Sequence, residues 1–209
     1  MVVSLVVGKR TAEAVSEVVR DFRRRTGSRV MRLITSDEYP AYPDAIRAAY
    51  GTTVVPPRTG RPGRPREPYL VMPPEVTYAT VHKHRENGRV VRVSTRVVFG
   101  TLVAVALALL ASAVSRVVNT CFVERHNGTD RNRCSRKTRK SYAFSKDWDV
   151  HRAATVFSHY GYNFCWPIRT LRVKADGRWR DRTPAMAAGL ADHVWALSEW
   201  LAFPAVQRR

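Results

Sequence analysis

The sequence predicts an α/β fold, because strand-like and helix-like patterns alternate along it. Val2–Val7 and Val30–Thr35 are short apolar runs of the kind that form buried strands. An amphipathic segment separates them, and residues 78–98 read as two further strands joined by a turn. Strands mixed with helices over a single core indicate an α/β or α+β architecture.

The first 57 residues are expected to form strand, helix, strand and helix. Thr11 is placed to cap the first helix, and Gly27 to end it. Its apolar stripe consists of Ala14, Val15, Val18, Val19 and Phe22. After the Val30–Thr35 strand, Pro43 opens a short helix that runs to Tyr50.

Residues 56–68 form a Pro/Gly/Arg linker, which excludes regular structure there. Glu86-Asn87-Gly88 is a hairpin turn signal. Beyond it we expect an Ala-rich helix, a basic helical stretch over about residues 119–140, and a helix capped by Ser145. Thr183-Pro184 begins a small helical unit near the end of the chain.

The charge balance favours a polyanionic partner. The 209 residues hold 36 Lys+Arg against 17 Asp+Glu, a net charge of +19. Nucleic acid or an anionic membrane surface would suit such a chain. Three isolated cysteines, Cys121, Cys134 and Cys165, argue against a structural zinc site and suit a reducing cytoplasm.

One segment raises the alternative of a membrane protein. Residues 97–114 carry no charge, close to the roughly 18–20 apolar residues that a spanning helix needs. The run is nevertheless rich in Ala and interrupted by Gly100, Thr101 and Ser112. We therefore expect a buried helix of a soluble protein, with no membrane partner.

Two acidic residues stand where chemistry is expected. Asp37 follows a buried-type strand, and ligand-binding groups of α/β folds gather at such strand ends. If the segment around Glu124 is helical, Glu124, Asn127 and Arg131 lie on one face, suited to a metal ion and a phosphate. The alternative is that Glu124 pairs with a neighbouring Arg on a solvated face.

Four segments resemble the ordered motifs of insertion-sequence-one transposases. They are VGKRT (7–11), TSDEYPAY (35–42), VERHNGTDR (123–131) and RKSYAFSKDWDVH (139–151), and they occur in the family's order. The resemblance implies an RNase H-like domain that cuts and joins DNA with Mg²⁺ or Mn²⁺. It makes Asp37 and Glu124 the second and third catalytic, metal-binding acids, and Arg131 a contact to a DNA end.

The chain departs from this family in two ways. The family's first acid lies on a strand upstream of Val2, and here no Asp or Glu precedes Glu13. We therefore expect an RNase H-like domain without its first strand, which is either an inactive chain or a fragment of a longer reading frame. Asp37 and Glu124 are also 87 residues apart, which suggests an insertion. The predicted parts are a first core segment (1–57), the insertion (58–115), the Glu124 helix with its basic sequel (116–170) and a helical appendage (171–209).

A basic surface is expected to bind DNA phosphates, the alternative being a solvated cationic face. Its members are Asn127, Arg131, Arg133, Arg136, Lys137, Arg139, Lys140 and Lys146. In the linker, Arg61, Arg64 and Arg66 between prolines resemble an AT-hook that lies in a narrow minor groove, unless they form a flexible basic tether. The aromatic residues from Tyr142 to Trp166 are interpreted mainly as core.

The resulting hypothesis is a cytoplasmic, nucleoid-associated transposase that acts as a homo-oligomer on double-stranded transposon ends. It has no small-molecule substrate. Two alternatives remain open: a DNA-binding remnant without catalysis, and a small basic membrane-associated protein.

Overall fold

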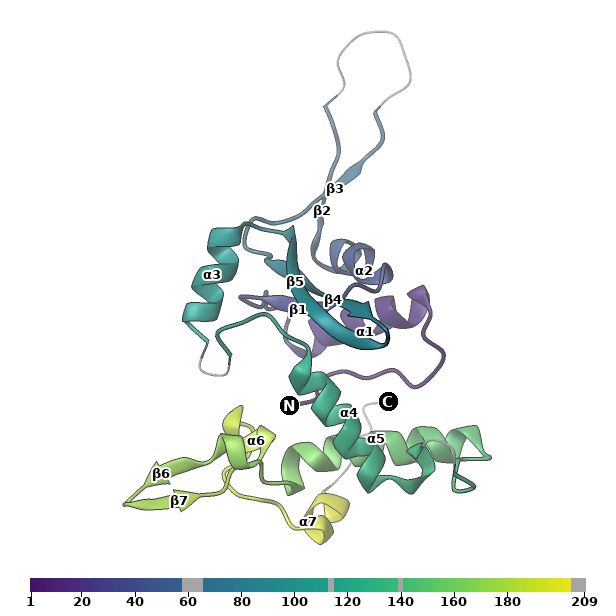
Figure 1. The fold of residues 1–209 in the computed structure, drawn as a ribbon, viewed down its shortest axis with the longest axis vertical. Helices are drawn as coiled ribbons and strands as arrows, with labels where there is room; N and C mark the ends of the chain where they lie inside the picture. The colour runs from purple at the N-terminus through teal and green to yellow at the C-terminus, as the bar shows by residue number, and fades with distance from the viewer. Residues whose placement is uncertain (58–65, 113–114, 139–140, 204–209) are drawn as a thin grey trace. The chain divides into compact units, whose positions relative to one another are not determined.

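The computed structural model describes residues 1–57, 66–112, 115–138 and 141–203, and it combines helices with small sheets (Figure 1). The chain divides into two compact units. We call Gly8–Glu124 the sheet unit, and Met1–Val7 together with Arg125–Arg209 the helical unit. The mixed α/β class predicted from the sequence is confirmed.

The sheet unit is built on three strands, β1 (Ile34–Asp37), β4 (Tyr78–Glu86) and β5 (Arg89–Phe99), in the order β1-β4-β5. β1 runs parallel to β4, and β4 antiparallel to β5. The predicted hairpin is confirmed, since Asn87 and Gly88 both take the positive φ that a tight turn requires. The segment expected to be an insertion thus supplies two strands of the same sheet as Asp37.

Helices α1 (Ala12–Arg25) and α2 (Ala41–Tyr50) pack against each other and form the core with the sheet (Figure 1). Thr11 caps α1 as predicted, accepting a hydrogen bond from the Ala14 N–H at 3.2 Å. The core cluster joins α2 to the start of β4 through Ile46, Ala49, Tyr50, Val76 and Tyr78. Burial of these side chains from water holds the unit together.

The remaining elements of the sheet unit are short. β2 (Thr52–Val54) and β3 (Tyr69–Val71) pair on either side of the Pro/Gly/Arg linker and lead away from the sheet (Figure 1). Helix α3 (Leu102–Leu110) was expected to be buried, but only Val105 is, and Leu102 and Leu107 are exposed. Across the described ranges, no helix combines the length and the apolar character needed to cross a membrane.

The helical unit contains mostly short elements. They are α4 (Cys121–Arg133), which begins in the sheet unit, η1 (Ser135–Lys137), α5 (Trp148–Cys165), η2 (Arg169–Leu171), β6 (Val173–Ala175), β7 (Arg178–Arg180), α6 (Pro184–Ala187) and α7 (Leu197–Ala202). α4 and α5 fall where basic and amphipathic helices were predicted. Thr183 caps α6, again as expected.

Three further local predictions were wrong. Val2–Val7 forms no strand; at its start, the Asn163 side chain accepts from the Val2 N–H and donates to the Val2 carbonyl. Asp147, not Ser145, caps α5, because the Asp147 carboxylate accepts a hydrogen bond from the Val150 N–H at 2.7 Å. The appendage is not purely helical, since Asp176 and Gly177 take positive φ and turn β6 back on β7.

Candidate functional site

Asp37 is the last residue of β1, and its carboxylate is held by the first of the four motifs. The Arg10 guanidinium donates to Asp37 Oδ2 at 2.7 Å, and both side chains are about half exposed. Tyr39 secures Arg10 in turn: its hydroxyl donates to the Arg10 carbonyl at 3.2 Å, and its ring lies under the guanidinium. Two segments singled out in the sequence therefore meet around one carboxylate.

Glu124 lies in the first turn of α4, and its carboxylate reaches across to the sheet. Lys83 of β4 donates to Glu124 Oε1, and the Thr120 hydroxyl donates to the same oxygen at 2.9 Å. The hydrogen bond from Lys83, followed by that from Thr120, lowers the pKa of Glu124 below its ordinary value. Glu124 is therefore ionised and paired with a lysine on β4, not with a neighbouring Arg of its own helix.

The strand register brings the two carboxylates to one face of the sheet. Asp37 pairs with Val81 in the parallel β1–β4 ladder, and paired residues project to the same face. Lys83 follows Val81 by two residues, about 6.6 Å along the strand, so it shares that face. Because Glu124 contacts Lys83, the Asp37 and Glu124 carboxylates approach the same face of the sheet unit near the end of β1.

A further acid, Glu38, was not singled out from the sequence. Its carboxylate contacts His82 Nδ1 on β4. His82 alternates with Val81 and Lys83 along β4 and projects to the other face, and Glu38, which directly follows the end of β1, contacts it there. The register, which the sequence does not reveal, separates the two neighbouring acids.

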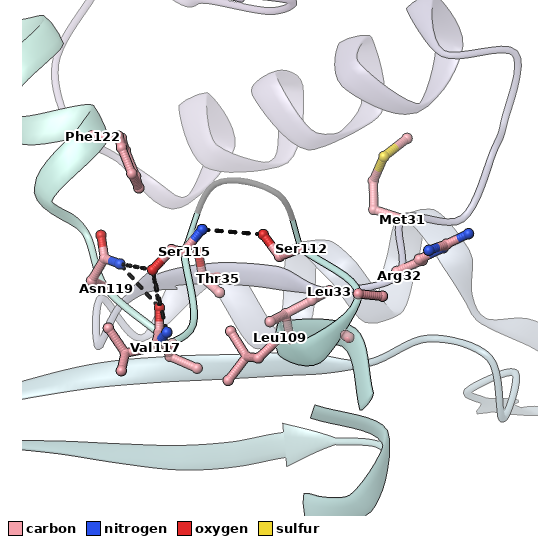
Figure 2. Close-up of a pocket in the computed structure, with 13 residues that line it drawn as sticks. Met31, Arg32, Leu33, Thr35, Leu109, Ser112, Ser115, Val117, Asn119 and Phe122 are labelled. Atoms are coloured by element: carbon pink, nitrogen blue, oxygen red, sulfur yellow. Dashed lines mark hydrogen bonds between the residues drawn. The ribbon is translucent and has the colours of Figure 1, made fainter. Parts of the chain in front are cut away.

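The segment leading into α4 is fixed by a hydrogen-bonded turn beside a pocket (Figure 2). The Asn119 amide donates to Ser115 Oγ at 2.8 Å and to the Val117 carbonyl at 3.0 Å. Its oxygen accepts from the Cys121 N–H at 3.2 Å, which satisfies a free donor at the start of α4. The pocket, of about 400 Å³, is lined partly by Leu33, Leu109, Val117 and Phe122. Asn119 therefore sets the position from which Glu124 projects.

Helix α4 has one exposed and one buried side. The predicted helix is confirmed here, so Glu124, Asn127 and Arg131 do lie along one face, and all three are exposed. On the other side Asp130 is buried and accepts hydrogen bonds from Lys137 (2.7 Å) and Ser158 (2.6 Å). The ion pair with Lys137 ties α4 to η1, and the hydrogen bond from Ser158 ties α4 to α5 within the helical unit.

Two buried histidines complete the contact between α4 and α5. His126 Nε2 and His159 Nδ1 are 2.8 Å apart, and His159 Nε2 lies 3.5 Å from Asp130. Burial lowers the pKa of both histidines, so both are neutral at pH 7. Both histidines therefore serve packing and polar contacts within the helical unit.

The residues predicted to bind DNA fall into three groups. Asn127, Arg131, Arg136, Lys146 and, in the linker, Arg66 are exposed. Two others are used within the fold. Lys137 pairs with buried Asp130, and the Arg133 guanidinium lies 3.2 Å from the centre of the Trp166 ring. The third group, Arg61, Arg64, Arg139 and Lys140, lies outside the described residues.

The aromatic residues were interpreted as core, and this is wrong for several of them. Tyr142, Phe144, Trp148 and Trp166 are exposed, Tyr142 almost completely (99%). Tyr160, Tyr162 and Phe164 are half-buried. The exposed members lie in or next to segments that carry exposed cations, an arrangement typical of surfaces that bind nucleic acid.

The acid pair is compatible with a hard divalent cation. Within the described residues, no cluster of three or more His, Cys, Asp and Glu side chains is arranged to hold a metal ion. Mg²⁺, however, is commonly bound through one or two carboxylates, with water and substrate phosphate completing its coordination. Asp37 and Glu124 are two exposed carboxylates of the sheet unit, and each is paired with a cation.

No family model matches the chain, and neither does any curated protein or solved structure.

Proposed function

We propose that this chain is the RNase H-like catalytic part of a DNA transposase similar to the insertion-sequence-one family. The observation that carries the proposal is the shared sheet face of Asp37 and Glu124, set by the Asp37–Val81 register and the Lys83–Glu124 ion pair. The motifs around Arg10 and Asp37, which the resemblance treats separately, also meet in one contact. In the described residues β1 pairs only with β4.

Asp37 and Glu124 would hold Mg²⁺ or Mn²⁺ through their oxygens. When bound, such an ion supplies Lewis-acid stabilisation of charge on the phosphate and activation of the attacking oxygen. Metal binding would release Arg10 and Lys83 from the two carboxylates. Both cations would then bind oxygens of the scissile phosphate and orient it.

The proposed reaction is an in-line displacement at phosphorus. The oxygen of water, or of a DNA 3′-hydroxyl, forms a new bond to phosphorus as the bond to the leaving oxygen breaks. The attacking group loses its proton, and the leaving DNA oxygen gains one from solvent. With water the products are a 3′-hydroxyl and a 5′-phosphate, and with a 3′-hydroxyl the strands are joined.

Charge supports DNA as the substrate. The chain carries a net charge of +19, and Arg131, Arg136 and Lys146 expose their side chains on the helical unit. Phosphate neutralisation by such residues makes binding strongly dependent on salt. We propose double-stranded ends of a mobile element as the partner and a homo-oligomer at the nucleoid as the working form.

A second candidate is a DNA-binding protein without catalysis. It is favoured by the ion pairs themselves, because each carboxylate is already neutralised by a cation of the same unit. In that case Asp37 and Glu124 would only stabilise the fold, each by about 0.2–1 kcal/mol as exposed ion pairs.

Nicking and joining of plasmid and linear DNA in Mg²⁺ or Mn²⁺ separates the two candidates. Asp37→Asn and Glu124→Gln should each abolish strand cleavage and transfer while leaving DNA binding within about twofold, since neither group faces phosphate without metal. Asp44→Asn and Glu75→Gln are matched controls, because both acids are exposed and belong to the same unit. Cleavage retained by either site variant would rule out Asp37 and Glu124 as catalytic acids and leave the non-catalytic candidate.

A further inference from the structure

The hairpin β6–β7 of the helical unit has no counterpart among the expectations drawn from the sequence. Lys174 pairs with Trp179, and Ala175 with Arg178, across a two-residue turn. Asp176 and Gly177 form that turn with φ values of 51° and 74°, which match the twist of a tight hairpin. The hairpin projects from the helices of its unit (Figure 1).

Both faces of this hairpin are exposed. From residue 172 to residue 180 every residue is exposed except half-buried Ala175, and Trp179 exposes 68% of its surface. A two-stranded ribbon without a core on either face is marginally stable in water. An exposed Trp buries little of its ring there, and Trp is a residue that binding surfaces favour.

The hairpin and its flanks are strongly basic. Between residues 169 and 182 there are six Arg or Lys and two Asp, a net charge of +4. Asp181 pairs with Arg172 (2.5 Å) and Asp176 with Arg180 (2.7 Å). Lys174 and Arg178 have no acidic partner among the described residues, so their charges face solvent.

Because side chains alternate along a strand, Lys174, Arg178 and Trp179 are distributed over both faces of the hairpin. Lys174 and Trp179 are cross-strand partners and share one face, whereas Arg178 projects to the other. The two strands lie about 4.8 Å apart. A ribbon of this width fits the major groove of B-DNA, which is about 12 Å wide and admits two-stranded ribbons.

We infer that β6–β7 is a DNA-contacting ribbon that enters the major groove of a duplex. Lys174 and Arg178, on opposite faces, bind the phosphates of the two groove walls. Trp179 packs against the sugar or base edges beside Lys174. The inference shares DNA as a ligand with the proposed function but does not depend on cleavage, because it concerns residues remote in sequence from Asp37 and Glu124.

The test is the salt dependence of binding, measured by fluorescence anisotropy with the full chain and a random-sequence duplex of about 25 base pairs. EDTA is present throughout, so that failure of the catalytic proposal leaves the result unaffected. Lys174→Gln/Arg178→Gln should lower the slope of log Kd against log salt by about 1.8, or 0.9 for each phosphate contact. Between about 50 and 200 mM salt, the ratio of variant to unmodified Kd then changes about 12-fold.

The matched control, Arg24→Gln/Arg47→Gln, removes the same charge from exposed ion pairs of the sheet unit and should leave the slope unchanged. Trp179→Ala should weaken binding without altering the slope, since it removes packing and no charge. Circular dichroism checks that the variants fold. Equal slopes for hairpin and control variants, tighter binding of single-stranded than duplex DNA, or no DNA binding at all would each overturn the inference. So would a hairpin effect seen only with anionic phosphatidylserine vesicles.

Discussion

Replacing Lys83 with Met should strengthen metal binding while it weakens cleavage. Lys83 neutralises Glu124, and a divalent cation must displace it to use that carboxylate. The two side chains are 31% and 58% exposed, so the ion pair contributes about 0.2–1 kcal/mol. Since about 1.4 kcal/mol is a tenfold change in affinity, the Kd for Mn²⁺ should fall about 1.4- to 5-fold.

Isothermal titration calorimetry with Mn²⁺ at low ionic strength and without DNA measures this change directly. Lys146→Met, which removes the same charge from an exposed position of the helical unit, should leave the Kd for Mn²⁺ unchanged. In the cleavage assay Lys83→Met should be slower than the unmodified chain, because the phosphate loses a cationic partner. An unchanged or higher Kd for Mn²⁺ in Lys83→Met would refute the competition on which this reasoning rests.

Three further predictions concern stability. Asp130→Asn should destabilise the helical unit by about 3 kcal/mol in urea unfolding, because it leaves Lys137 buried without a counter-charge. Adding Lys137→Met should restore most of the lost stability. Equal stability of the single and double variants would contradict this. Burial lowers the pKa of His159, which faces His126, Asp130 and Lys137. A lowered folded-state pKa gives stability that is present above about pH 6.5 and is lost as the pH falls through the folded-state pKa. The thermal midpoint should therefore drop between about pH 7 and pH 5. The drop should be smaller in His159→Gln. Gly100→Ala should cost about 1–3 kcal/mol, because Gly100 has a φ of +82° and a Cβ there would come within 3.2 Å of backbone; a thermal midpoint equal to that of the unmodified chain would argue against it.

The features of the fold that depend on local chemistry could be predicted from the sequence. The Thr11 cap and the Asn87-Gly88 turn follow from residues within a few positions of one another. Val2–Val7 could not be predicted in the same way, although it has the composition of a strand. Its first backbone groups are satisfied by the Asn163 side chain, 161 residues away, and no local pattern reports such a contact.

In the candidate site, too, some residues could be predicted from the sequence and others could not. Asp37 could be found because the end of an apolar strand is visible in the sequence, and Glu124 because its helix carries a recognisable motif. Their ion-pair partners could not be found, since Lys83 contacts Glu124 only through the register of β4 against β1. The hairpin β6–β7 was missed because each strand has only three residues, too few for an alternating pattern to be seen.

The most direct test of the central claim is whether one cation uses both carboxylates. Calorimetric Mn²⁺ affinities for the unmodified chain, Asp37→Asn, Glu124→Gln and the double variant form a complete double-mutant cycle. A shared ion predicts that each single variant loses most of the affinity and that the double variant loses hardly more. Additive losses, or an affinity that neither substitution changes, would mean that Asp37 and Glu124 do not form one site.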